Sequence, residues 1–88
     1  MCTYAIVKTT LRGSAKGPAS SWFRVTDGVV YFDHPVHAPA DHTLNIDFTN
    51  PDEGPAARVA VELTATSARE LVDAIQAALD SAPAELTH

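Results

Sequence analysis

The sequence contains a single cysteine, Cys2, and therefore cannot form an intramolecular disulfide. A lone thiol suits a reducing compartment, so we expect the protein to be cytoplasmic. The chain has no apolar run of membrane-spanning length and no signal sequence at its start. We therefore expect no membrane partner.

Basic residues are also scarce. Six Lys and Arg stand against eleven Asp and Glu, which gives a formal net charge of -5. Phosphate binding needs clustered basic side chains, and these six are scattered, so we expect no nucleic-acid partner. Apolar residues make up 45% of the chain and charged residues 19%, as is typical of globular proteins. Eighty-eight residues fit a single domain over 1–88.

Alternation of apolar and polar residues predicts β-strands at residues 3–12, 43–50 and 58–64. Two shorter β-prone runs lie at 22–25 and 29–32. In the second of the long strands, Leu44, Ile46 and Phe48 would share one face, with Asn45 and Asp47 on the other.

Glycine and proline predict where the chain turns. Thr26-Asp27-Gly28 separates the two short runs and is typical of a hairpin turn, because glycine accepts the positive φ that such turns need. Residues 13–21 contain two glycines, a proline and three serines, a composition typical of a loop.

The apolar period changes near the end of the chain to that of a helix, which we expect from Ser67 to Ala82. Ser67 and Glu70 have capping-box spacing at its start. Leu71, Ile75 and Leu79 would be buried against a sheet. The sequence thus predicts an α+β fold, an antiparallel β-sheet of four or five strands with one C-terminal helix packed on one face. Because so small a domain builds a modest core, we also expect a homodimer formed through the sheet or its edge.

Three of the four histidines lie in a proline-containing loop over residues 33–42. Neutral imidazole is the commonest ligand of zinc and related divalent ions, and a nearby carboxylate can ligate the ion or orient a ring. The sequence therefore predicts a divalent-metal site, although the spacing matches no named zinc motif. The candidate residues are His34, His37, His42, Asp33 and Asp41. His37 would be the central ligand, whereas His88 lies in the C-terminal tail and is excluded from the set.

Two other interpretations stay open. In the first, the protein is a metal-free dimeric module that binds a small molecule or a partner protein, and the histidines are ordinary loop residues. In the second, it is a small enzyme or accessory protein of specialised metabolism, in which a histidine works with Asp47 or Glu62 as acid and base. The sequence does not decide whether the protein is an enzyme.

Several segments together resemble a family of short bacterial proteins of unknown function. They are Met1-Cys2-Thr3, Gly13-Ser14-Ala15-Lys16-Gly17, Val30-Tyr31-Phe32-Asp33-His34-Pro35-Val36-His37-Ala38-Pro39 and Leu44-Asn45-Ile46-Asp47-Phe48. The resemblance covers nearly the whole chain. It implies no activity, cofactor or catalytic residue.

Overall fold

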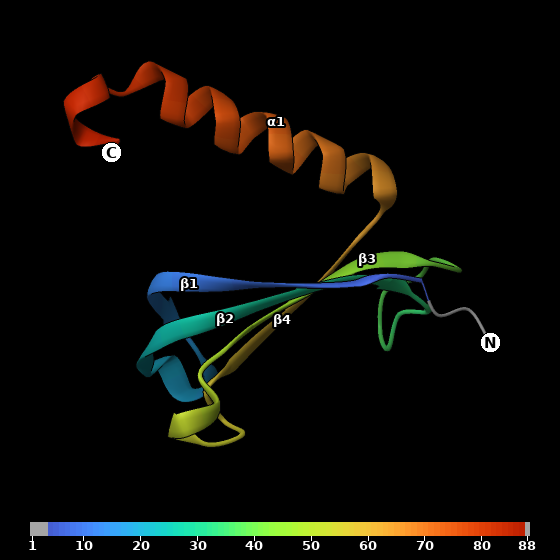
Figure 1. Ribbon diagram of the computed structural model, residues 1–88. Coiled ribbons are helices and arrows are strands. Elements are labelled where there is room, and N and C mark those ends of the chain that lie inside the picture. The colour runs from blue at the N-terminus through green and yellow to red at the C-terminus, as the bar shows by residue number, and fades with distance from the viewer. Residues whose placement is uncertain (1–3, 88) are drawn as a thin grey trace.

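The computed structural model describes residues 4–87, so Cys2 and His88 lie outside the described part of the chain. Four antiparallel strands form one sheet in the order β1-β2-β3-β4, and a single long helix follows them (Figure 1). The elements are β1 Ile6–Lys16, β2 Trp22–Asp33, β3 Thr43–Thr49, β4 Arg58–Leu63 and α1 Ala65–Ser81, with short 3-10 turns at Pro18–Ser20, Pro51–Glu53 and Ala84–Leu86. The predicted α+β class is confirmed.

The prediction of a hairpin turn at Thr26-Asp27-Gly28 is wrong, because β2 runs straight through it. Gly28 pairs with Thr9 on one side and with Phe48 on the other, and its φ is not positive. A Cβ at Gly28 would come within 2.9 Å of Leu11 Cδ1, so glycine serves close packing here rather than turning. The two short predicted strands are therefore one long central strand, and the sheet has four strands rather than five.

The predicted loop over 13–21 is also mostly strand. β1 continues to Lys16, and the chain turns only at 17–21, where the Gly17 N–H donates to the Ser21 carbonyl at 2.7 Å. A bulge between Thr10 and Gly13 shifts the register within β1. Beyond this bulge lies a small core of buried Phe23, Val25 and Ala57, with Leu11, Ala15, Phe48 and Val59 packed against it.

Strand pairing gives the sheet two chemically different faces, and the predicted separation of Leu44, Ile46 and Phe48 from Asn45 and Asp47 is confirmed. We call one the apolar face, made of Val7, Val30, Phe32, Leu44, Ile46, Phe48, Val59, Val61 and Leu63. We call the other the polar face, which includes Lys8, Thr10, Tyr31, Asn45, Asp47, Arg58 and Glu62.

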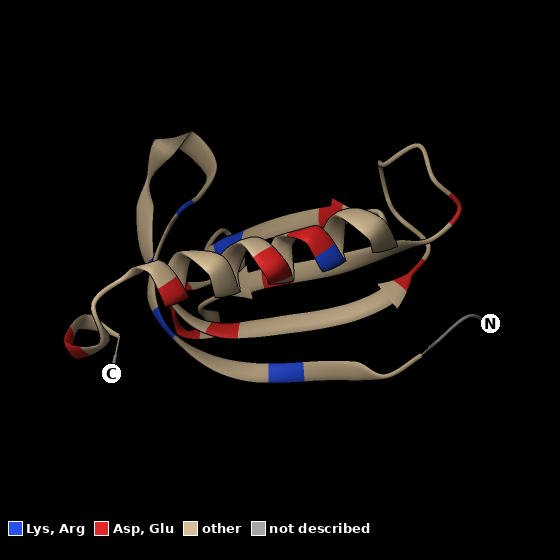
Figure 2. Ribbon diagram, turned by 90° about the horizontal axis from the view of Figure 1, so that it is seen from above, with Lys and Arg blue, Asp and Glu red and all other residues tan. Residues whose placement is uncertain are grey.

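Helix α1 begins directly after β4 and lies over the apolar face (Figures 1 and 2). Its N-cap is Thr64, whose hydroxyl accepts from the Ser67 N–H at 3.1 Å, so the predicted cap at Ser67 is wrong by one turn. Near its start, Ala65 and Ala68 line a shallow space with Phe32 and Leu44. Within residues 4–87, no helix is long and apolar enough to cross a membrane.

The prediction that Leu71, Ile75 and Leu79 are buried is wrong for the single chain. Their side chains are 42%, 52% and 51% exposed, and Val72 is 65% exposed. The helix diverges from the sheet along its length (Figure 1), which agrees with the exposure of these side chains. The apolar stripe was predicted from the sequence, but residues 4–87 do not supply a packing partner that buries it.

Candidate functional site

The loop between β2 and β3 folds onto the polar face and is tied there by Glu62 of β4. The Glu62 carboxylate accepts hydrogen bonds from three consecutive backbone N–H groups, those of Val36, His37 and Ala38, with the last two at 3.1 and 2.8 Å. These donors favour the charged form and lower the pKa of the Glu62 carboxyl group. Glu62 is thus an anchor for the loop, which leaves little of its capacity for acid–base chemistry.

Sequence reasoning missed this anchor. Glu62 is 24 to 26 residues from the three groups that it binds, and no local pattern connects them. The one available signal was the pair Pro35 and Pro39, which bracket the three residues whose N–H groups converge.

Three of the five predicted metal ligands come together at the base of this loop, where it leaves β2 and enters β3. His34, Asp41 and His42 each offer a ligand atom, and these atoms lie within 4.8 Å of one another. The His34 Nδ1 is 3.1 Å from the Asp41 backbone carbonyl oxygen, and the His42 Nδ1 is 3.0 Å from the Asp41 Oδ2. The His34 and His42 ring centroids are 4.4 Å apart. Asp41 therefore lies in contact with both imidazoles.

His42 is held more firmly than the other two residues. Its ring stacks on Phe32, with centroids 5.7 Å apart and planes inclined by 13°. Its Nε2 is buried and has no hydrogen-bond partner among residues 4–87. An imidazole that donates Nδ1–H to a carboxylate keeps a free lone pair on Nε2, the tautomer used by histidine ligands of metals. A bound ion would satisfy an atom that the described part of the chain leaves unpaired.

The other two candidates lie outside this group. Asp33 Oδ1 accepts from the His34 backbone N–H at 2.7 Å, so it fixes the chain at the start of the loop. His37 is exposed and lies over the polar face. The loop bends so that His34 meets His42, eight residues away, rather than His37. That bend was not evident from the sequence.

A pocket of about 510 Å³ is lined by residues of the loop and of the polar face. Within it, Arg58 Nη2 is 2.8 Å from Asp47 Oδ1, and the Tyr31 hydroxyl donates to Asp47 Oδ2 at 3.4 Å. Burial, and then the nearby Asp47 charge, raise the pKa of Tyr31, so the phenol is neutral at physiological pH. The pocket is lined by Tyr31, His34, His37, Asp47, Arg58 and Glu62, among others. Since His34 belongs to both, the pocket and the His34–Asp41–His42 group adjoin.

Comparison with known proteins identifies one family, described as a family of unknown function (DUF6295), which matches residues 1–88. No curated protein and no solved structure matches the chain.

Proposed function

The chain belongs to this family of unknown function, and from the geometry of its loop we propose that it binds a divalent metal ion such as zinc through His34, Asp41 and His42. The observation that carries the proposal is the convergence of two imidazoles and a carboxylate within 4.8 Å. The unpaired Nε2 of His42 supports it independently.

The donor set suits this chemistry. Zinc accepts imidazole nitrogen and carboxylate oxygen, and structural or catalytic sites use three or four protein ligands. Asp41 would either ligate the ion or orient His42 through the contact to Nδ1. With at most three protein ligands, the ion would keep a position for water or a small molecule. Such a molecule could enter from the adjoining pocket, which His34 also lines.

Calorimetry tests the proposal directly. Protein purified without an affinity tag and stripped with a chelator should bind zinc with saturable heat, at one ion per chain. His34→Ala and His42→Ala should each weaken binding by at least about 10-fold. His37→Ala is the matched control, because His37 lies in the same loop outside the group.

Two results would reject this ligand set. One is the absence of saturable heat with zinc, copper and nickel. The other is a loss of affinity in His37→Ala as large as in His34→Ala, which would restore His37 as the central ligand.

A second candidate function is the binding of a small polar molecule without a metal, and the observation that favours it is the pocket of about 510 Å³. Arg58, Tyr31 and the exposed His37 offer hydrogen bonds and charge to such a molecule. If the protein is an enzyme, the exposed His37 is freer for acid–base work than Glu62, which is bound by the loop, or Asp47, which is paired with Arg58 and Tyr31. Fragment screening by NMR would detect this function as shifts in the pocket residues that persist in His42→Ala. We assign either function to the cytoplasm, on the grounds of the single cysteine.

A further inference from the structure

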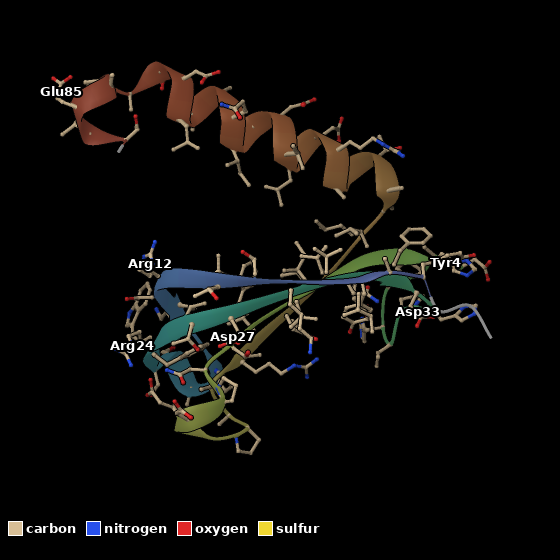
Figure 3. All side chains as sticks on the ribbon, viewed as in Figure 1. Tyr4, Arg12, Arg24, Asp27, Asp33 and Glu85 are labelled. Atoms are coloured by element: carbon tan, nitrogen blue, oxygen red, sulfur yellow. The ribbon has the colours of Figure 1, made fainter. Side chains whose placement is uncertain are left out.

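The largest unexplained feature of the molecule is the apolar surface between α1 and the sheet. The stripe of Leu71, Val72, Ile75 and Leu79 is exposed. It lies on the same side of the molecule as the apolar face, which is mostly half-buried. Figure 3 shows side chains of α1 and of the sheet directed toward one another without meeting over most of the helix. Exposed aliphatic surface on two facing elements indicates a binding site for another molecule.

The dimensions of the chain show how much surface is left open. A folded monomer of 9.3 kDa should expose about 5,000 Å², whereas this chain exposes 6624 Å². Its radius of gyration is 14.5 Å, compared with about 12 Å for a compact domain of this length. The excess of about 1,600 Å² per chain corresponds to about 3,200 Å² for a pair, within the range of obligate homodimers.

We propose that a second copy of this chain fills this space, so that the α1 stripe and the apolar face of each copy are buried in one two-fold interface. In the described part of each copy, the helix stripe is exposed and most of the apolar face is only half-buried. A two-fold axis would let the helix of each copy enter the open side of the other and cover both surfaces at once. The interface is thus the apolar face with α1, rather than the polar face or the sheet edge.

The charges of α1 favour a second copy over a membrane surface. Helices that lie on anionic membranes carry Lys and Arg beside their apolar stripe. The charged residues of α1 are one arginine and three acidic residues. Glu70, Asp73 and Asp80 lie off the stripe at helical spacing. Arg69 is the single basic residue of the helix, and it lines the space that α1 shares with Phe32 and Leu44. Figure 2 shows no cluster of Lys and Arg on the described residues that could hold the apolar face against anionic lipid. The acidic side would be repelled there.

The test is the mass and the contacts of the full chain in solution. Sedimentation at micromolar concentration should give a species of twice the 9.3 kDa chain mass. Ile75→Asp should raise the dimer dissociation constant by about 100-fold or more, because it buries a charge at the centre of an apolar interface. Ala77→Asp adds the same charge on the other side of α1 and should leave the constant within about 3-fold, as surface charges do.

Since a dimer of this kind can be required for folding, the wild-type chain supplies a second readout. In a sample that mixes isotope-labelled and unlabelled chains, filtered NOEs should connect α1 methyl groups of one chain with Ile46 or Val61 of another. Three results would overturn the proposal. They are a 9.3 kDa species with solvent-exposed α1 methyl groups, intermolecular NOEs confined to the polar face or the sheet edge, and a stable complex only with lipid vesicles or a different protein.

Discussion

The two faces of the sheet differ in how many of their side chains find a partner within a single chain. On the polar face, three N–H groups of the loop are paired with Glu62, and Asp47 is paired with Arg58 and Tyr31. On the apolar face, most aliphatic side chains are only half-buried, and the apolar side chains of α1 above them are exposed. Polar groups form hydrogen bonds only with specific partners, and here they find them within one chain, whereas apolar surface accepts any dry partner, including a second chain. The polar face is therefore where function within one chain is expected.

Phe32 connects these two regions. It belongs to the apolar face through its pairing with Leu44, and its ring also stacks on His42 of the candidate metal group. Packing of a second copy against the apolar face would therefore limit the movement of the ring that supports His42. Assembly and metal binding, though proposed on separate evidence, share this side chain.

The largest effect is expected from Ile75→Ala. In a dimer that buries Ile75, this truncation should cost about 2–5 kcal/mol, the range for core aliphatic residues. In an isolated chain, where Ile75 is 52% exposed, the cost should fall well below that range. Urea unfolding at two protein concentrations separates the cases, because the midpoint of an obligate dimer rises with concentration. A small, concentration-independent cost would mean that the stripe stays in water.

The next effect concerns Asp41, in the candidate metal group. Asp41→Asn should weaken zinc binding by about 10–100-fold if the carboxylate orients His42, since outer partners of histidine ligands typically contribute this much. Asp33→Asn is the matched control, because Asp33 contacts the His34 backbone and lies outside the ligand group. Calorimetry with the two variants measures the difference. Equal losses would show that loop shape, rather than the contact between Asp41 and His42, sets the affinity.

A smaller effect is expected at the junction of the two regions, where Thr64 caps α1. Thr64→Ala should lower the free energy of unfolding by about 1 kcal/mol, because it removes the acceptor of the Ser67 N–H. Ser67→Ala should cost less, although the sequence pattern pointed to Ser67 as the cap. Chemical denaturation of both variants ranks them. The reverse order would place the start of the helix at Ser67 after all.

These residues show what the sequence could predict. The strand period and the helix period were sufficient for the α+β class, and alternation in β3 was sufficient for its two faces. The turn preference of Asp27-Gly28 led to the wrong prediction of a hairpin turn. β1 and β3 pair with β2 on both sides, and this strand pairing outweighs the preference of two residues. The candidate metal group was predicted by residue type, but not which three residues converge. That depends on the loop path, which Glu62 fixes from a distant strand.

The most local effect is the pH dependence of the loop anchor. The pKa of the Glu62 carboxyl is lowered in the folded protein by the N–H groups of Val36, Ala38 and His37. A lowered pKa means that the anchor is fully present above the unfolded-state value of about 4.3. It is lost as the pH falls through the lower folded-state value. We therefore expect these three amides to be protected from hydrogen exchange at pH 7. They should lose this protection as the solution is acidified below pH about 4, while the amides of β3 stay protected.

The variant Glu62→Gln reproduces this loss at neutral pH and separates it from acid unfolding. Its amide carries no charge and presents an NH₂ group where three donors already converge, so the three amides should exchange as in an open loop. Glu70→Gln, on the exposed surface of α1, removes the same charge without touching the loop and should leave their protection unchanged. If Glu62→Gln kept the amides protected, the prolines and the contacts at the base of the loop, such as that between His34 and Asp41, would be sufficient to hold the loop. The polar face would then be less complete within one chain than its hydrogen bonds indicate.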